Sequence, residues 1–471
     1  MDVRNPRSGE IDYRFVPTEE SQIIATCARA RKGQKAWEAL AVPGRAAVLQ
    51  QWKQRLIASR EDLLQALSRD TGRLRESVRE VDNLGKWIDR WTTAAEDVLS
   101  GESRTTSNAA ITSIDDYSAY PLVGIISPWN FPLSLSLMDA IPALLAGCAV
   151  VVKPSEVTPR FVEPLRKTIE ACETLCEVLF YVLGDGAVGE ALIDQVDMVC
   201  FTGSTATGRK VSEQAARRFI PVFTELGGKD PAIVLESADI ERASTAILTG
   251  SVLGVGHQCY SIERIYVADS IHDVFLASLV KKAKRLHLVY PEITDGEIGP
   301  IIYDQQASII ARHLDDALKR GGRCHTGGKI EQHGGGLWCE PTVLTEVDHS
   351  MLIMQEETFG PIMPVMRFSS VDEAVRLAND TDYGLSAAVF AGTIDEALAV
   401  ARRIDAGAIS VNDAGLAPFF IGAPDVAEKT AFKSSGLGGS RLGIQSIKRF
   451  VRKKAILCNT SKDRSPWWYD V

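Results

Sequence analysis

The sequence predicts an α/β protein with a doubly wound parallel sheet, a second α/β unit and a small β ribbon. Short, continuously apolar segments such as Val123–Ile126 and Ala149–Val152 alternate with segments of helical period such as Leu133–Leu145. Buried parallel strands joined by helices produce this alternation, because both faces of their sheet are covered. A second series of the same kind begins after Asp230 and continues to about Ile421. We therefore expect two α/β units in succession.

The other predicted elements lie before, within and after this alternation. Residues 21–100 place apolar and charged positions at helical spacing, which predicts a helical N-terminal layer. The loosely alternating segment Ala109–Tyr120 predicts an exposed ribbon. Further predicted elements are the strands Val178–Val182, Met198–Phe201 and Ala232–Leu235, a basic helix at Ser446–Lys454 and a last strand at Lys454–Cys458.

Composition and charge restrict the class of protein. The chain has 471 residues, 45% of them hydrophobic, which is enough for two or three domains with a large core. A net charge of -9 argues against a nucleic-acid partner. No apolar run reaches the roughly 18–20 residues that span a bilayer, so we expect no membrane partner. The first residues, Met1–Pro17, lack the apolar stretch of a signal peptide.

The cysteines indicate the compartment. Nine of them are scattered without a disulfide pattern, which predicts a reducing, cytoplasmic location. Cys172 and Cys176 could share one face of a helix, but no second His or Cys pair follows at zinc-ligand spacing. We therefore predict no metal site.

One cysteine, Cys259, lies in an unusual setting. The stretch Gly254–Val267 runs from a glycine-bearing approach into the apolar Ile265–Val267, so the thiol would lie on a turn held by a buried strand. This position suits a catalytic nucleophile. The alternative is a buried packing role, which is the commoner one for a free cysteine.

Two further stretches carry polar groups beside predicted strands. Asn130, between Pro128 and Pro132 and just after a strand, could present its amide as a preset donor to a developing oxyanion. Glu225, between an apolar strand and two glycines, would be partly desolvated and suited to general-base work. The alternatives are a proline-rich turn for the first and a solvated loop edge for the second.

Two other strand ends could bind anions or hydroxyl groups. The sequence Phe201–Arg209, with Ser204 and Gly208, links a strand to an amphipathic helix whose free N–H groups form an anion site. Lys153 and Glu156, after another strand, could hold ribose hydroxyls, or could form a solvated charge pair. The glycine spacing alone is weak evidence, since it matches neither G-x-G-x-x-G nor a Walker sequence.

Together these stretches resemble the aldehyde dehydrogenase superfamily. The resemblance covers nearly the whole chain and rests on Pro128–Pro132, Phe201–Gly208, Glu225–Lys229, the Cys259 stretch and Glu356–Pro361. The order of these motifs and the 34 residues from Glu225 to Cys259 also match the family pattern. Several independent motifs in agreement make a chance match very improbable.

The resemblance implies a reaction and a set of catalytic residues. Cys259 would attack an aldehyde to give a thiohemiacetal, and loss of hydride would leave a thioester. Asn130 and the backbone N–H of Cys259 would form the oxyanion hole, and Glu225 would activate the water that releases a carboxylic acid. The alternatives are acyl transfer to coenzyme A, which an intact Glu225 disfavours, and a non-catalytic relative.

The resemblance also implies NAD as the cofactor, with NADP as the alternative. The residues expected to bind it are Ser127, Trp129, Lys153, Ser155, Glu156, Thr202, Gly203, Ser204, Gly208, Leu226, Glu357 and Phe359. Ser204 and its helix would hold the pyrophosphate, Lys153 and Glu156 the adenine ribose, and Glu357 the nicotinamide ribose. The carboxylate of Glu156 should repel a 2′-phosphate, which favours NAD.

The predicted domains follow the same resemblance. Residues 1–105 and 127–228 would form an NAD-binding domain, 229–435 a catalytic domain, and 106–126 with 436–471 an oligomerisation ribbon and C-terminal tail. Pairing of Ala109–Tyr120 and Lys454–Cys458 across subunits would give a homodimer or homotetramer. The apolar tail, Ser465–Val471, would dock on a neighbour or near an entrance.

The substrate is the least determined feature. The residues expected to contact it are Leu135, Met138, Gln258, Phe419 and Phe420, whose apolar majority suits an aliphatic or aromatic aldehyde. The alternative is a succinate-semialdehyde-type dehydrogenase, which would need an Arg or Lys in the tunnel. Two departures from the family pattern leave specificity open: His257 stands where a glutamine is usual and could tune the thiol, and Asp413–Lys429 is longer than usual.

Overall fold

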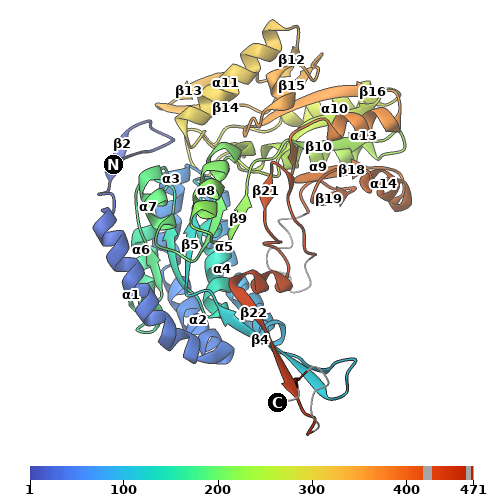
Figure 1. The fold of residues 1–471 in the computed structure, drawn as a ribbon. Coiled ribbons are helices and arrows are strands. Elements are labelled where there is room, and N and C mark those ends of the chain that lie inside the picture. Colours follow the sequence, from blue (N-terminus) through green and yellow to red (C-terminus); the bar gives the residue numbers. More distant parts are fainter. Residues whose placement is uncertain (417–426, 463–467, 470–471) are drawn as a thin grey trace.

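The computed structural model describes residues 1–416, 427–462 and 468–469. They form two α/β domains and a projecting ribbon (Figure 1), which confirms the predicted fold class. None of the helices in these residues is both long and apolar enough to span a bilayer. The tail that was predicted to dock is described only at residues 468–469.

The first domain is organised on a six-stranded sheet in the order β21–β9–β8–β5–β6–β7. Its strands are β5 (Leu122–Ile126), β6 (Ala149–Lys153), β7 (Leu179–Tyr181), β8 (Met198–Thr202), β9 (Val222–Glu225) and β21 (Gly436–Leu437). Strands β5 to β9 run parallel, and β21 is antiparallel to β9. The chain moves outward from β5 to β7 and then returns to place β8 on the other side of β5. The strand order therefore reverses between β5 and β8, where ligands of such sheets bind.

Helices cover both faces of this sheet. On one face lie α5 (Pro132–Ala146) and α6 (Val162–Glu170), with α2 (Ala41–Ala58), α3 (Arg60–Thr71) and α4 (Leu74–Leu99) packed outside them. On the opposite face lie α1 (Glu20–Ala39), α7 (Gly186–Ile193) and α8 (Thr205–Arg217). The predicted N-terminal helical layer is thus α1 to α4, and its fully buried Trp37 and Trp52 join it to the core of the sheet.

The second domain has a seven-stranded sheet in the order β12–β15–β16–β11–β10–β18–β19, parallel except between β12 and β15. Its strands are β10 (Asp230–Val234), β11 (Ile262–Ala268), β12 (Arg323–Thr326), β15 (Thr342–Thr345), β16 (Ile362–Phe368), β18 (Ser386–Phe390) and β19 (Ala408–Val411). Its helices are α9 (Ile240–Val252) and α10 (His272–Ala283) on one face, and α11 (Asp304–Lys319), α13 (Val371–Asn379) and α14 (Ile394–Ala401) on the other.

Short elements lie outside the two sheets. They are the pairs β1 (Asp2–Arg4) with β2 (Ile11–Arg14), β13 (Ile330–His333) with β14 (Gly336–Cys339) and β17 (Tyr383–Gly384) with β20 (Phe432–Lys433), and the helix α12 (Leu352–Gln355). The pair β17–β20 ties the C-terminal segment to the second domain just before that segment enters the first sheet as β21.

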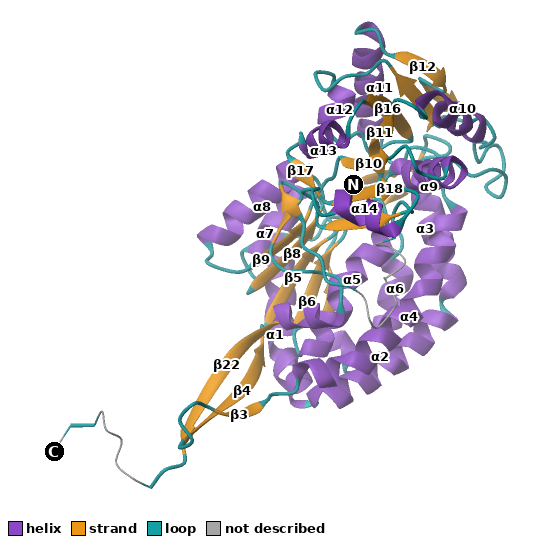
Figure 2. Cartoon of the chain, turned by 90° about the vertical axis from the view of Figure 1, so that its right-hand side faces the viewer, coloured by secondary structure: helices purple, strands orange, loops and turns teal. Residues whose placement is uncertain are grey.

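The ribbon consists of β3 (Ser103–Thr105), β4 (Ile111–Ala119) and β22 (Val451–Asn459), and it projects from the body (Figure 2). Strands β4 and β22 pair with each other along their whole length within the one chain. The predicted helix Ser446–Lys454 is wrong at its end, because a 3-10 helix, Ile444–Phe450, stops where β22 begins to pair with β4.

The sheets also correct the predicted domain boundaries. Strand β5, assigned by prediction to the ribbon segment 106–126, is a central strand of the first sheet, and β3, assigned to 1–105, belongs to the ribbon. Strand β21 and the 3-10 helix, assigned to 436–471, pack on the first domain. Local sequence shows that a strand forms, but its partners along the chain decide which sheet it joins.

The two sheets meet where β9 leads into β10 through the four residues Leu226–Lys229. Strand β9 reaches this junction with its carboxyl end, whereas β10 and β11 present their amino ends to it. Cys259 precedes β11, and its backbone oxygen lies 2.3 Å from the position of a Cβ at Gly228. The junction therefore brings ligand-binding strand ends of the first domain to the nucleophile candidate of the second.

Gly33 tests how closely α1 packs on its neighbours. A Cβ at Gly33 would lie 2.3 Å from the backbone oxygen of Glu177. Gly33→Ala should therefore lower the free energy of unfolding by about 1–3 kcal/mol, although alanine is the better helix former. Gly85→Ala in α4 is the control: its nearest contact is the flexible Lys53 side chain at 3.4 Å, so it should stabilise by up to about 1 kcal/mol. Urea unfolding measures both, and equal midpoints would contradict the close contact.

Candidate active site

Cys259 lies on a turn immediately before β11, as the sequence predicts. The residues that lead to it, Gly254, Val255 and Gly256, have positive φ angles of 60°, 65° and 69°. A Cβ at Gly256 would lie 2.3 Å from the backbone oxygen of Gly360, so a glycine is needed for this close approach. The turn is thus held against the loop that precedes β16, and Cys259 is half-buried.

Asn130 reaches the same turn from the first domain. Its residue is 5% exposed, and its Nδ2 donates a hydrogen bond to the backbone oxygen of His257 at 2.9 Å. The guanidinium of Arg73 donates both to the backbone oxygen of Asn130 and to that of Gly254, the latter at 2.8 Å. Because an amide nitrogen carries two hydrogens, the bond to His257 leaves one for a further acceptor near Cys259.

Glu225 ends β9, and its carboxylate is paired with Lys429. The distance from Lys429 Nζ to Glu225 Oε2 is 3.0 Å, and each side chain is only 14% exposed. Both charges act on Cys259: burial, followed by the Glu225 carboxylate, raises the pKa of the thiol to about 12, and Lys429 opposes this shift. The three side chains therefore form one electrostatic cluster.

Sequence reasoning missed Lys429. It is 204 residues from its partner in the chain, and the only available signal was its place at the end of the unusually long segment Asp413–Lys429. Its backbone N–H donates to Ser440 Oγ at 3.1 Å, so hydrogen bonding fixes this end of the segment beside the cluster.

A buried ion pair forms the floor of the site. Lys229 Nζ lies 2.6 Å from Glu263 Oε2, and the two side chains are 0% and 2% exposed. Glu263 also accepts hydrogen bonds from the backbone N–H groups of Thr358 and Phe359, at 2.7 Å each. Sequence analysis did not single out Glu263, yet its carboxylate fixes the loop that carries two predicted cofactor residues, Glu357 and Phe359.

Glu357 lies at the junction between the domains. Its Oε1 accepts the backbone N–H of Gly228 at 3.1 Å, and its carboxylate lies 2.4 Å from the position of a Cβ at Gly227. Burial, followed by the charge of Glu263, raises the pKa of Glu357 to about 8. Gly227 therefore allows the carboxylate to lie directly against the backbone.

Trp129, His257 and Phe359 form an aromatic cluster at the same place. The Phe359 ring stacks on His257 at a centroid distance of 5.7 Å, and the edge-on Trp129 ring lies 5.0 Å from His257 and 5.4 Å from Phe359. Burial and the nearby Arg73 lower the pKa of His257 well below its usual value. The neutral ring supplies no positive charge that would ionise Cys259.

Four predicted cofactor residues surround the N-terminus of α8. Ser204 is the N-cap, and its Oγ accepts the backbone N–H of Thr207 at 3.3 Å. A Cβ at Gly208 would lie 2.4 Å from Leu226 Cδ2, and one at Gly203 would lie 2.6 Å from the ring of Phe201. The glycines thus let the helix start close to β8 and β9.

The remaining predicted cofactor residues lie at the ends of β5, β6 and β8. Lys153 Nζ and Glu156 Oε2 form an ion pair at 3.1 Å, and Ser155 Oγ accepts the backbone N–H of Val157. The buried Ser127 Oγ has no hydrogen-bond partner among the described residues. Thr202 is a different case, because its hydroxyl accepts a hydrogen bond from Arg441 at 2.6 Å and so supports the strand end from within the protein.

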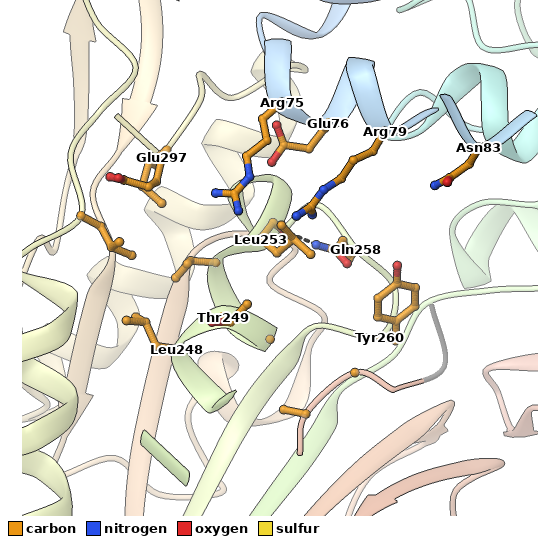
Figure 3. A pocket seen from close by; sticks show the side chains of 16 residues that line it. Arg75, Glu76, Arg79, Asn83, Leu248, Thr249, Leu253, Gln258, Tyr260 and Glu297 are labelled. Atoms are coloured by element: carbon orange, nitrogen blue, oxygen red, sulfur yellow. Dashed lines mark hydrogen bonds between the residues drawn. The ribbon is translucent and has the colours of Figure 1, made fainter. Parts of the chain in front are cut away.

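A cavity of about 530 Å³ lies where α4 faces the segment Leu248–Tyr260 (Figure 3). Gln258 and Tyr260, the two neighbours of Cys259, line it, and Gln258 Nε2 donates to the backbone oxygen of Leu253. Helix α4 supplies the facing wall, which includes two arginines that sequence reasoning did not place there.

The predicted substrate residues are divided by the structure. Gln258 lines the cavity beside Cys259, but Met138 lines a separate cavity of about 20 Å³ between α4 and α5, and Leu135 lines neither. Phe419 and Phe420 lie outside the described residues. The position of α5 explains the difference, because helical periodicity does not show which side of a helix faces the nucleophile.

Comparison with known proteins places the chain in a family. Residues 1–456 match the model of the aldehyde dehydrogenase family. The chain belongs to this family and is an aldehyde dehydrogenase.

Individual relatives agree over the whole fold. The structure of a putative aldehyde dehydrogenase, PutA, from Anabaena variabilis is 56% identical, with a TM-score of 0.98 and 100% of both chains covered. A betaine aldehyde dehydrogenase from Staphylococcus aureus, solved in complex with NAD+, is 31% identical, with a TM-score of 0.92 over 100% of this chain and 93% of that one. A putative NADP+-dependent succinate-semialdehyde dehydrogenase from Mycolicibacterium smegmatis is 35% identical over 92% of this chain and 84% of the relative.

Alkylation of Cys259 tests the electrostatic cluster. Only the thiolate reacts, so with a pKa near 12 the rate with iodoacetamide should be low at neutral pH and should rise about tenfold per pH unit. Glu225→Gln removes a carboxylate that raises this pKa and should speed the reaction at fixed pH, whereas Lys429→Met should slow it. Mass spectrometry of the Cys259 peptide follows the rates, and identical rates in all three proteins would contradict the cluster.

Proposed function

We propose that Cys259, Asn130 and Glu225 perform the oxidation of an aldehyde to a carboxylic acid, as nucleophile, oxyanion donor and general base. The observation that carries this proposal is their convergence at the junction of the two domains. Asn130 is hydrogen-bonded to the turn of Cys259 at 2.9 Å, and the charges of Glu225 and Lys429 act on the Cys259 thiol.

The first half of the reaction makes a bond to sulfur. The thiolate of Cys259 attacks the carbonyl carbon, and the electron pair of the C=O bond moves to oxygen. The free N–H of the Asn130 amide and the backbone N–H of Cys259 stabilise this oxyanion. Collapse of the oxyanion restores the C=O bond and expels hydride, which leaves an acyl thioester on Cys259.

The second half releases the acid. Glu225 takes a proton from a water molecule, whose oxygen attacks the thioester carbon, and the sulfur of Cys259 leaves with the C–S electron pair. Lys429 offsets the repulsion between the carboxylate and the thiolate that is formed again. The ion pair with Lys429, at 3.0 Å, also holds the Glu225 carboxylate in place before it accepts the proton.

The cofactor is NAD(P), which accepts the hydride on its nicotinamide ring when bound. The described residues fit such a group: α8 begins with a capped N-terminus at the point where the strand order reverses, and the buried Ser127 Oγ there lacks a protein partner among the described residues. Trp129 and Phe359 would border the nicotinamide side, and Glu357 its ribose. We propose NAD as the preferred form. Lys153, Ser155 and Glu156 would border the adenine ribose, and the carboxylate of Glu156 would repel the 2′-phosphate of NADP.

The ribbon and the cysteines support two further assignments. Strand β22 is an edge strand with Leu457 68% exposed and Ile456 42% exposed, which suits pairing with another subunit in a homodimer or homotetramer. All nine cysteines are free, which fits a cytoplasmic location.

Two variants separate the halves of the reaction. Cys259→Ala should abolish reduction of NAD with any aldehyde, because no thioester can form, and should leave NAD binding nearly unchanged. Glu225→Gln should form one equivalent of NADH per active site rapidly. Its steady-state rate of NADH formation should then be at least about a hundredfold below that of the unchanged protein, because the acyl-enzyme cannot be hydrolysed. Stopped-flow absorbance and intact-mass analysis detect the burst and the acyl adduct. An unchanged steady state in Glu225→Gln would exclude it as the base.

The choice of cofactor depends on Glu156. Glu156→Gln should raise kcat/KM for NADP relative to NAD by about tenfold, because it removes a negative charge that repels the 2′-phosphate. Glu163→Gln, a change at an exposed carboxylate on α6, is the charge control and should leave the ratio unchanged. Initial rates with each cofactor give the ratio, and an equal shift in both variants would refute a contact at residue 156.

A further inference from the structure

Two arginines of α4 face the cavity beside Cys259. Arg75 and Arg79 are separated by four residues, and Asn83 follows four residues later, so all three project from one face of the helix. Figure 3 shows both guanidinium groups pointing from α4 toward the opposite wall at Leu253.

The charge of Arg79 acts on Tyr260, the residue that follows the nucleophile. Burial raises the pKa of the Tyr260 hydroxyl, the Cys259 thiolate adds to that shift, and Arg79 opposes it. Tyr260 follows Cys259 directly and lines the same cavity as Arg79. A ligand held at the two arginines would therefore extend toward Cys259.

Neither arginine has a counter-ion among the residues that the structure describes. Within residues 1–416, 427–462 and 468–469, no ion pair or hydrogen bond joins the side chain of Arg75 or Arg79 to another residue, and both are exposed to the cavity. A pair of guanidinium groups on one helix face repel each other unless an anion lies between them.

The carboxylates that line the cavity are engaged elsewhere. Glu297 accepts the backbone N–H of His287 at 3.0 Å. Glu76 is only 6% exposed, and it acts on a different cation: burial lowers the pKa of Arg73, and the carboxylate of Glu76 opposes that shift. The cavity wall thus leaves two guanidinium groups available to an external anion.

We propose that Arg75 and Arg79 form a carboxylate-binding subsite, so that the preferred substrate is a short aldehyde with a carboxylate at its other end. The proposal rests on the function proposed for Cys259 and specifies the substrate class. A guanidinium binds a carboxylate through two parallel N–H···O bonds, and Asn83 adds an amide donor on the same face. Leu248, Val252 and Leu253 line the space below and suit the methylene groups between the two ends.

This subsite favours the alternative that the sequence left open, a succinate-semialdehyde-type dehydrogenase with an arginine in the tunnel. A cavity of about 530 Å³ with an apolar floor would accept an unbranched aliphatic aldehyde. The two cations add a preference for the acid that a neutral aldehyde of equal length cannot obtain. The preference is electrostatic and partly exposed to solvent, so it should weaken as ionic strength rises.

A matched pair of substrates tests the subsite. The full chain with NAD is assayed with succinate semialdehyde and with butanal, which has the same chain length and no carboxylate. The expected result is a kcat/KM at least about tenfold higher for the acid, with the advantage reduced in high salt. Arg79→Gln and Arg75→Gln should each lower kcat/KM for the acid about tenfold through KM and leave that for butanal unchanged, while Arg79→Lys retains part of the preference.

Two controls separate this proposal from the proposed function. Lys281→Gln removes an exposed cation of α10 that does not line the cavity, and kcat/KM should change for neither substrate. Succinate, which has no aldehyde, should inhibit butanal oxidation competitively, and more weakly in Arg79→Gln. Equal use of both aldehydes with no effect of the arginine variants would overturn the subsite and leave the reaction intact. Oxidation of neither aldehyde nor of a longer apolar one would overturn the proposed function as well.

Discussion

The buried pair of Lys229 and Glu263 is the interaction on which the site depends. Lys229 is the last residue of the crossing between the domains, and Glu263 lies on β11, four residues after Cys259. Through Glu263 the pair also binds the backbone of Thr358 and Phe359. Removing one partner of such a pair leaves an uncompensated buried charge, at a cost of about 3–5 kcal/mol. A single ion pair thus sets the relative positions of the stretches that carry Glu225, Cys259 and Glu357.

The rest of the site follows from how the two sheets meet. The first sheet supplies the carboxyl ends of its strands: Asn130 follows β5, Ser204 follows β8, and Glu225 ends β9. The second sheet supplies the amino end of β11, which is preceded by a turn with positive φ angles that lies in close backbone contact with Gly360. Carboxyl ends of the first sheet therefore face amino ends of the second sheet. This arrangement brings the sulfur of Cys259 to the edge of the first sheet where a dinucleotide would bind.

Electrostatics give the resting site a definite character. Burial and the nearby carboxylates both favour the neutral form of the Cys259 thiol. The charge of Lys429 opposes them and favours the thiolate. The neutral His257 contributes packing with Trp129 and Phe359 instead of charge. Arg75 and Arg79 of α4 place positive charge on the cavity wall. A substrate that moves from this wall to the sulfur therefore passes from cationic to acidic surroundings.

The sequence by itself determined the fold class, the helical layer, most strands and the residues expected to do chemistry, because apolar period and short motifs such as Glu225–Lys229 are local properties of the chain. It did not determine which sheet β5 joins, where the helix before β22 ends, or which side of α5 faces the nucleophile. It also gave no sign that Lys429 pairs with Glu225 or that Arg75 and Arg79 line the cavity. Those facts depend on contacts between residues far apart in the chain, and only the packing of α4, α5 and the C-terminal segment around the domain junction decides them.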